Sequence, residues 1–415
     1  MLQESAAPRR VPAPMPAMTG ENTDTRRRPQ DRDGFLWIDS ARNSPEGLSF
    51  IGTDPSRIVE GGPGDWALLE DILPEAPAFA SGSCDARERK VIPPGGVAGF
   101  IRFDGSFRFG VYGRFSPPGE MLSGELPVAP SGSAEGFSFR PDLDRGAYEA
   151  MVRRTQEYIA AGDIYQACIA HRFRAPAAGD PWKLYLALRT CSPAPHAAYI
   201  NLGGEQVLSS SPECFLEIDG RTIRTRPIKG TRPRGTGLEE DDREARDLVS
   251  SPKEAAELVM ITDLERNDLG SVCEFGSVRA TELLKLERHA QVHHLVSTVE
   301  GRLRPGLSHL DALAACFPGG SISGAPKKRA LEIIRELEPA PRGLFTGAIG
   351  YFGNDGRSQF NIAIRTVVVG EGEASFHVGA GITAGSDPGR EWEETLHKAA
   401  GILKASGGET FRASA

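Results

Sequence analysis

The sequence has few of the signals that mark secreted, metal-cluster or membrane-spanning proteins. Its six cysteines are scattered and none belongs to a CxxC pair, so reduced thiols fit better than a disulfide frame, and a zinc site is not expected. No apolar run approaches the roughly 18 residues of a membrane-spanning helix. We therefore expect a cytoplasmic protein with no membrane partner.

Positive charge is also in short supply. The chain has 48 Lys and Arg residues against 56 Asp and Glu residues, which gives a formal net charge of -8. A surface for nucleic acid would show a basic footprint, so no nucleic-acid partner is expected. An anionic substrate would need arginine and lysine side chains clustered at one place.

The composition is otherwise that of a folded protein. Of 415 residues, 39% are hydrophobic and 25% charged, so a large core can be buried in one large domain or two interlocked ones. The first 33 residues are rich in Pro, Arg, Asp and Thr with almost no large apolar side chains, which predicts a disordered arm. The predicted parts are the arm at 1–33, a sheet-rich N-terminal lobe at 34–126, a linker at 127–141, a catalytic domain at 142–407 and a tail at 408–415.

Hydrophobic periodicity predicts a mixed fold. Apolar residues recur at helical spacing from Tyr148 to Ile159, followed by the strand-like run Ile164–Phe173. Strands and helices then come without regular βαβ alternation, so we expect the α+β class with largely antiparallel sheets. Further helices are expected at about 252–265, 308–316, 326–338 and 388–405, and strands near 345–352, 360–368 and 374–379.

One lysine stands at the end of an apolar strand, directly before a glycine and among four arginines, in the segment Arg224–Gly235. Lys229 is a candidate nucleophile, because burial or neighbouring cations can lower an amine pKa from its reference value of about 10.4. A solvated basic loop is the other interpretation, since lysine side chains are usually exposed.

Two expected helix starts, Ser251-Pro252 and Asp387-Pro388, are each followed by two glutamates three residues apart. Residues at this spacing lie on one helical face, and two facing pairs would supply the oxygen ligands that Mg²⁺ prefers. For either pair taken alone, capping and solvent exposure are the favoured interpretation. The pairs are Glu254 with Glu257, and Glu391 with Glu394.

Two loops have residues suited to an anion. The segment Gly379–Gly385 follows a strand and is one residue too long for a dinucleotide fingerprint, so its glycines predict either a carboxylate cradle or a tight turn. The segment Ser321–Lys327 offers a hydroxyl and a free helix N-terminus, although capping would also explain its serines.

A histidine cluster and one arginine complete the candidate residues. The triplet His289, His293 and His294 has no acidic partner at zincin spacing, so a single catalytic or positioning histidine is favoured. Arg365 lies inside the apolar run Ile362–Val369, where an arginine needs an internal carboxylate or a ligand anion as partner.

Taken together, these segments resemble the chorismate-utilising family, which includes anthranilate synthase component I and aminodeoxychorismate synthase component I. The match runs from roughly Asp142 to Ala405 and identifies 142–407 as a chorismate-binding catalytic domain. The motifs that carry it are Ser211-Pro212-Glu213, Pro227–Gly235, Ile261–Gly270, His294–Ser297, Ser323–Lys327, Gly347–Tyr351, Ile364–Thr366, Gly379–Ile382 and Glu394–Ala399.

The resemblance implies two interlocked halves with helices outside and the active site in the cleft between the sheets. It implies that Glu257 and Glu394 hold Mg²⁺, with Glu254 and Glu391 acting through water. It further implies roles in catalysis and in binding chorismate, a substrate with two carboxylates. The residues concerned are Lys229, Glu213 and His294 for catalysis, and Ser321, Arg365, Gly379, Gly381 and Lys398 for substrate binding.

The reaction predicted within this family depends on Lys229. Anthranilate synthases typically have alanine there, whereas Pro-Ile-Lys-Gly-Thr is typical of aminodeoxychorismate synthases, in which the lysine forms an adduct before ammonia displaces it. We therefore expect aminodeoxychorismate synthase component I, which makes 4-amino-4-deoxychorismate for 4-aminobenzoate and folate. The alternatives are anthranilate synthase component I, of tryptophan biosynthesis, and a non-catalytic chorismate-binding protein.

The chain has no Gly-x-Cys-x-Gly elbow of the kind that would hold a glutamine-hydrolysing nucleophile. Ammonia is therefore expected from a separate glutamine amidotransferase subunit, with free ammonium as a substitute in vitro.

Overall fold

The computed structural model describes residues 28–40, 48–73, 91–122, 134–289 and 292–408. Most of the expected arm, almost all of the tail and residues 127–133 of the linker lie outside these ranges. A short 3-10 helix, η1 (Pro29–Asp31), precedes the first strand. Among the described residues, no helix combines the length and apolar character needed to cross a membrane.

The first of two sheets, called sheet A, has nine strands. Its strands pair antiparallel throughout, with β6 attached to β7 beside the main path. In spatial order they are β15 (Gly324–Ala325), β7 (Gln166–Pro176), β19 (Glu373–Ile382), β18 (Thr366–Gly370), β9 (Glu205–Ser211), β8 (His196–Asn201), β1 (Phe35–Asp39) and β2 (Phe50–Gly52), with β6 at Arg140–Pro141.

The second sheet, sheet B, has ten strands and is also antiparallel, with β13 attached to β14. In spatial order they are β12 (Ile228–Pro233), β14 (Val292–Arg302), β11 (Thr222–Arg226), β10 (Cys214–Asp219), β17 (Arg357–Ile362), β16 (Ala348–Gly353), β4 (Gly96–Ile101), β5 (Phe107–Tyr112) and β3 (Arg57–Gly61), with β13 at Arg279–Arg288.

The chain passes between the sheets several times. It leaves sheet A between β9 and β10, returns between β14 and β15, and returns again between β17 and β18. The expected sheet-rich lobe contributes to both sheets, since β1 and β2 join sheet A while β3, β4 and β5 join sheet B. The expected class, α+β with two interlocked halves of antiparallel sheet, is confirmed.

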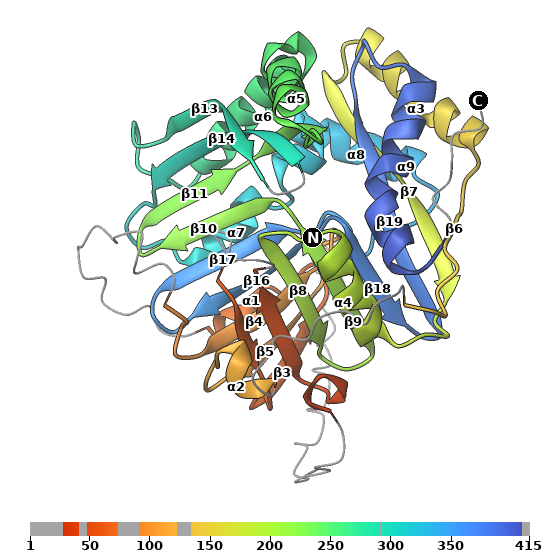
Figure 1. Ribbon diagram of the computed structural model, residues 1–415. Helices are drawn as coiled ribbons and strands as arrows, with labels where there is room; N and C mark the ends of the chain where they lie inside the picture. Colours follow the sequence, from red (N-terminus) through yellow and green to blue (C-terminus); the bar gives the residue numbers. More distant parts are fainter. Residues whose placement is uncertain (1–27, 41–47, 74–90, 123–133, 290–291, 409–415) are drawn as a thin grey trace, which may run out of the picture.

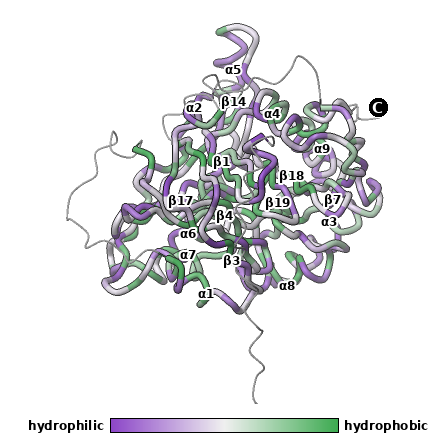
Figure 2. The backbone as a smooth tube through the Cα atoms, turned by 90° about the horizontal axis from the view of Figure 1, so that it is seen from below, coloured by the Kyte–Doolittle hydropathy of each residue, from purple (hydrophilic) through white to green (hydrophobic). Residues whose placement is uncertain are grey.

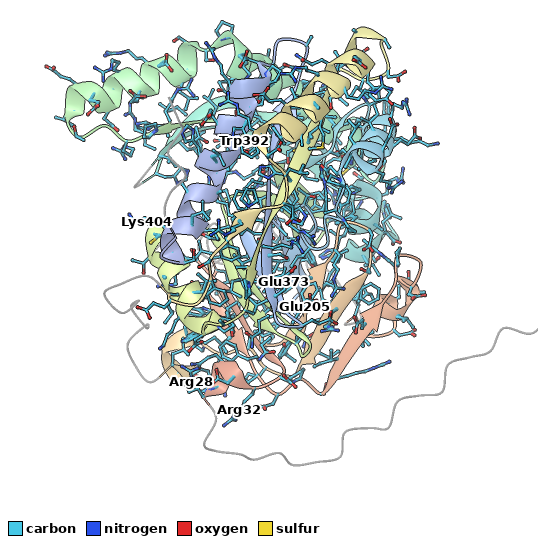
Figure 3. All side chains as sticks on the ribbon, turned by 90° about the vertical axis from the view of Figure 1, so that its right-hand side faces the viewer. Arg28, Arg32, Glu205, Glu373, Trp392 and Lys404 are labelled. Atoms are coloured by element: carbon cyan, nitrogen blue, oxygen red, sulfur yellow. The ribbon has the colours of Figure 1, made fainter. Side chains whose placement is uncertain are left out.

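Helices lie outside the sheets (Figure 1). Helices α3 and α9 pack on each other and on β7 and β19, whereas α5 and α6 cover β12, β13 and β14. Figure 3 shows α9, with Trp392 labelled, running beside α3 along one side of the molecule. The helices are α1 (Ala67–Glu70), α2 (Pro118–Met121), α3 (Arg145–Ala160), α4 (Pro181–Cys191), α5 (Leu238–Ser250), α6 (Pro252–Gly270), α7 (His309–Cys316), α8 (Lys327–Leu337) and α9 (Pro388–Ala405), with the 3-10 turn η3 at Gly320–Ile322.

The core forms in layers because each sheet is covered on both faces. Leu36 and Val207 of sheet A pack with Phe100 and Tyr351 of sheet B in one cluster between the sheets. Other clusters lie under α4 and α9, under α6 and α7, and under α3 and α8. Figure 2 shows hydrophobic residues gathered among the strands in the middle of the molecule.

Expected and observed elements agree best where the sequence has clear helix-start residues. Ser251 and Asp387 accept hydrogen bonds from backbone N–H groups of α6 and α9, and a proline follows each cap. Helix α6 continues to Gly270, beyond the expected end at 265. Helices α4 and α5 were not expected, because the first is apolar on most sides and the second follows a basic segment that was interpreted as a loop.

A buried ion pair fixes α8 to sheet A. Arg342 is 4% exposed and binds both carboxylate oxygens of Glu338, at 2.6 and 2.8 Å. It also donates to the carbonyls of Cys168 (2.7 Å) and Ile322 (3.1 Å). Glu338 in turn accepts the N–H of Ala170 at 2.8 Å. Arg342 therefore joins helix, sheet and the η3 turn.

Replacing Arg342 with methionine is expected to lower the free energy of unfolding by about 3–5 kcal/mol, because Glu338 is left as an unpaired buried charge. Arg329→Met is the control, since Arg329 pairs with Asp163 at the half-exposed surface and its loss should leave the free energy of unfolding almost unchanged. Urea denaturation followed by circular dichroism measures both. Equal losses for the two variants would contradict the assigned role.

Candidate active site

Lys229 lies on the edge strand of sheet B, where that strand bulges. The β12–β14 register shifts between Lys229 and Thr231, and Gly230 between them has φ +70°. A side chain at Gly230 would come within 3.0 Å of Glu254 Oε2, so the glycine allows α6 to approach. The Lys229 ammonium is half-buried and donates to the Ser321 carbonyl at 3.2 Å. The alternative of a solvated loop is not observed.

Glu213 and Ser321 lie in two of the segments where the chain changes sheet. Both are buried, at 5% and 7% exposure. Burial raises the pKa of Glu213, while the Ser321 hydroxyl and the Lys229 ammonium partly oppose this rise. The Ser321 hydroxyl is near enough to favour the charged form of Glu213, yet it forms no regular hydrogen bond within the described part of the chain. That geometry leaves the hydroxyl available to a ligand.

His294 and Arg365 line a cavity of about 90 Å³. Burial, with the nearby Arg365 charge, lowers the pKa of His294 to about 3, so its ring is neutral at pH 7. Burial also lowers the pKa of Arg365, opposed by the charge of Glu213. Arg365 forms no ion pair with any other described residue. Its guanidinium could therefore pair with an anion that enters the cavity.

The expected setting of Arg365 inside one strand was wrong. Strand β17 ends at Ile362 and β18 begins at Thr366, so Arg365 lies in the connection between sheets B and A. Its backbone has φ +49°, a left-handed conformation that non-glycine residues seldom adopt. The apolar sequence on both sides gave a continuous strand pattern because both flanking strands are buried.

The three histidines of the expected triplet lie in different surroundings. His293 is fully buried and its Nε2 lies 2.9 Å from Asp241, so it is part of the protein interior. Asp241 on α5 also binds Arg234 at 2.6 Å, and this charge holds the pKa of Asp241 well below its usual range. Asp241 thus ties the end of β12 to β14. His289 and His294 remain beside the cavity.

Gly381 of β19 faces Lys229 across the two sheets. A side chain at Gly381 would come within 2.3 Å of Gln166 Nε2 and 3.8 Å of Lys229 Nζ, whereas one at Gly379 would meet β7 of the same sheet. Gly381 therefore leaves room for the Gln166 side chain beside Lys229. Gln166, 2% exposed, was missed by the sequence analysis, and its Oε1 has no partner among the described residues. The feature of the sequence that could have identified Gln166 is that it is a lone side-chain amide in the strand-like run 164–173.

The glutamate pair on α6 faces the glutamate pair on α9. Lys253 was not singled out from sequence, yet its Nζ lies 3.9 Å from Glu257 and 3.6 Å from Glu391, one carboxylate from each helix. Glu391 is 2% exposed and its Oε2 has no protein partner in the described ranges. The carboxylates of the two helices thus converge on a cation.

Lys398 joins α9 to the glycine strand, because its Nζ binds Glu394 at 2.7 Å and the Gly379 carbonyl at 2.8 Å. Burial would raise the pKa of Glu394, but Lys398 outweighs it and the pKa is lowered. Burial raises the pKa of Glu257, opposed by Lys229 and Lys253. The two helices therefore present carboxylates of unequal acidity to one space.

The expected site residues thus come from both sheets and two helices, and each is linked to the next by a contact or a shared charge. In the described ranges, no group of three or more His, Cys, Asp or Glu side chains is already arranged to hold a metal ion. Lys253 lies between Glu257 and Glu391, at 3.9 and 3.6 Å from their carboxylates.

Comparison with curated proteins gives close relatives of one name. Anthranilate synthase component 1 of Thermus thermophilus is 49% identical over 285 residues, which are 68% of this chain and 62% of that protein. The protein of the same name from Streptomyces coelicolor is 45% identical over 294 residues, 70% of this chain and 58% of that protein. The chain therefore spans about three fifths of the length of these relatives.

These relatives overturn the expected aminodeoxychorismate synthase. Proteins 44 to 49% identical to the chain are named anthranilate synthase component 1, which is the alternative reaction. The expectation was wrong because it gave one side chain, Lys229, more weight than agreement over most of the catalytic domain. A lysine that donates to a backbone carbonyl has a structural partner, and its presence alone does not specify a covalent step.

The fold agrees with this relationship. The crystal structure of anthranilate synthase component I from Streptococcus pneumoniae TIGR4 superposes with a TM-score of 0.70 at 27% identity, covering 89% of this chain and 90% of that one. The family of chorismate binding enzymes matches residues 114–404, which include all the candidate residues. The chain belongs to the family of chorismate binding enzymes.

Proposed function

We propose that the chain converts chorismate and ammonia to anthranilate and pyruvate, the reaction of an anthranilate synthase component 1. The observation that carries the proposal is the 45 to 49% identity to relatives of that name over about two thirds of the chain. The geometry supports it, because Arg365 lines a cavity, the charges of Glu213 and Arg365 act on each other, and carboxylates of α6 and α9 meet at Lys253.

The substrate's charges match the proposed binding groups. Chorismate has two carboxylates, and two cations are available to them: Arg365, which lines the cavity, and Lys398, which binds the Gly379 carbonyl. Gly381 leaves its backbone partly exposed where a side chain would block the approach, and Gly379 holds Lys398 by its carbonyl. The Ser321 hydroxyl and the Gln166 amide oxygen, both without partners in the described part of the chain, supply further polar contacts.

Glu213 is the proposed general acid. Burial raises its pKa, so it holds a proton at higher pH than an exposed glutamate does. Ammonia adds at C2 while the C4 hydroxyl takes the Glu213 proton and leaves as water. Loss of the C2 proton and of the enolpyruvyl group as pyruvate then gives the aromatic ring of anthranilate. His294, neutral at pH 7, contacts the ring region without adding charge.

Magnesium is the proposed cofactor, and the residues present fit it. The buried Glu391 Oε2 has no protein partner in the described ranges, and Lys253 shows that a cation is accommodated between the helices. Glu257 and Glu394 would hold the ion directly, and Glu254 and Glu391 through water. When bound, the ion would neutralise a substrate carboxylate.

We also propose a separate glutamine amidotransferase partner as the source of ammonia. The relatives are named as component 1, which indicates a second component, and the sequence has no glutaminase elbow of its own. Free ammonium then replaces the partner in vitro.

Purified protein supplied with chorismate, Mg²⁺ and ammonium is expected to release anthranilate, detected by its fluorescence, with an equal amount of pyruvate measured by lactate dehydrogenase. The same mixture without ammonium is the control. Consumption of chorismate without pyruvate release would contradict the proposed reaction, since any amination that keeps the enolpyruvyl group yields no pyruvate.

Glu213→Gln is expected to lower kcat by about 10²- to 10⁴-fold with little change in KM, because it removes the proton donor and keeps the shape. The pKa of Glu213 is raised and its protonated form is the active one, so wild-type kcat should fall as pH increases through that pKa. Glu217→Gln on the neighbouring β10 is the control, since that carboxylate pairs with Arg224 at 3.8 Å. Steady-state rates across pH 5–9 decide, and an unchanged Glu213→Gln rate would exclude the acid role.

Glu394→Gln is expected to raise the Mg²⁺ concentration needed for half-maximal rate by at least about tenfold, because one anionic oxygen ligand is lost. Glu393→Gln is the matched control on the same helix, where the carboxylate pairs with Arg145 at 3.3 Å. Titrating Mg²⁺ into protein stripped with EDTA gives both values. A shift of the same size in Glu393→Gln would point to a general charge effect.

A further inference from the structure

Helix α6 has two buried carboxylates that the proposed chemistry does not use. Glu265 is 2% exposed and Asp268 is 7% exposed. They continue the helical face that begins with Glu257, since Ile261, Glu265 and Asp268 follow it at spacings of four, four and three residues. One end of this face therefore meets the proposed metal ligands, and the other end lies against the η3 turn.

Glu265 holds the η3 turn by its backbone. Its Oε1 accepts the N–H of Gly320 at 3.0 Å, whereas its Oε2 is buried and has no hydrogen-bond partner among the described residues. The contact requires glycine, because a side chain at Gly320 would come within 2.8 Å of Leu264 and 3.0 Å of Glu265 Oε1. Helix α6 and the η3 turn are thus in direct contact, and the Glu265 carboxyl group is the hydrogen-bond acceptor between them.

The opposite side of the same turn faces the proposed reaction centre. Ser321 follows Gly320 directly; its carbonyl accepts the Lys229 ammonium at 3.2 Å, and its hydroxyl favours the charged form of Glu213. Any displacement of the Gly320 amide therefore moves the partner of Lys229 and the neighbour of Glu213 together.

A second pair anchors the ends of the segment that contains the turn. Lys327, the first residue of α8, binds Asp268 at 2.5 Å and the Cys316 carbonyl at 2.9 Å. Lys327 thus neutralises Asp268, and Glu265 has no ion pair within the described residues. Burial and the adjacent Asp268 raise the pKa of Glu265 to about 8, opposed by Lys327, while Glu213 adds to the rise. Glu265 is therefore a neutral acid at pH 7.

We propose that Glu265 is a positioning residue of the active site, which fixes the Gly320–Ser321 peptide and through it the placement of Lys229 and Glu213. This inference rests on the proposed function only in taking the space around Glu213 as the reaction centre.

Glu265→Met tests the proposal, because methionine keeps the length of the side chain and removes the acceptor. Loss of a buried carboxyl without an ion pair should leave the melting temperature equal or higher. We expect kcat for chorismate consumption to fall about 100-fold, as for other small misplacements of reacting groups. The Gly320 amide should exchange with deuterium faster, measured on a peptide covering 317–324.

Glu265→Gln keeps an acceptor for the Gly320 amide and should retain kcat within about threefold, with wild-type exchange. Asp263→Asn is the control on the same helix, where the exposed carboxylate pairs with Arg266 at 2.8 Å. If Glu265→Met does not fold, Glu265→Asp replaces it, because the shorter side chain withdraws the acceptor and keeps the carboxyl group.

Wild-type kcat and wild-type amide exchange in Glu265→Met would overturn the positioning role, and so would equal losses in Glu265→Gln and Glu265→Met. The readouts are the rate of chorismate loss and the exchange of one amide, so neither depends on which product forms. Failure to find anthranilate would refute the proposed function and leave the comparison of the Glu265 variants interpretable.

Discussion

The structure depends on the repeated passage of one chain between two antiparallel sheets. Each sheet contains strands from both early and late parts of the sequence, so neither is complete without the other. The passages cannot take part in a sheet's hydrogen-bond ladder along their whole length. Three of them contain proposed active-site residues: Glu213 between β9 and β10, Ser321 between β14 and β15, and Arg365 between β17 and β18.

This arrangement explains how much could be predicted from sequence. The starts of α6 and α9 follow from local capping residues, and the spacing of the glutamates on each helix follows from helix geometry. That the two helices face each other is a property of the sheets' pairing, which is non-local. The same is true of Lys253, whose contact with Glu391 joins residues far apart in the chain.

Two of the residues that were missed share one physical character. Gln166 and Glu265 are buried polar side chains, and each has one oxygen without a partner in the described ranges. In sequence they look like ordinary members of a strand and a helix. Arg365 was recognised because an arginine in an apolar run is conspicuous, but the run concealed a break, since two buried strands joined by a short connection have the same pattern as one.

Lys229 was given too much weight for a related reason. Its neighbours in sequence identified the family correctly, and the single residue was then used to choose the reaction. In the structure its ammonium has several partners: the Ser321 carbonyl, and the charges of Glu213 and Glu257. A cation so placed balances carboxylates whatever bond is formed, so its presence is compatible with more than one reaction at the same centre.

Charge balance then links the proposed substrate to the proposed cofactor. Four cations already lie beside the carboxylates of the two helices, which leaves Arg365 as a cation without an ion pair among the described residues. A substrate with two carboxylates would bring one negative charge more than Arg365 neutralises, into a space where burial already raises the pKa of Glu257. A divalent cation would supply the missing positive charge. The helix carboxylates are Glu254, Glu257, Glu391 and Glu394, and the cations beside them are Lys229, Lys253, Lys398 and Arg232.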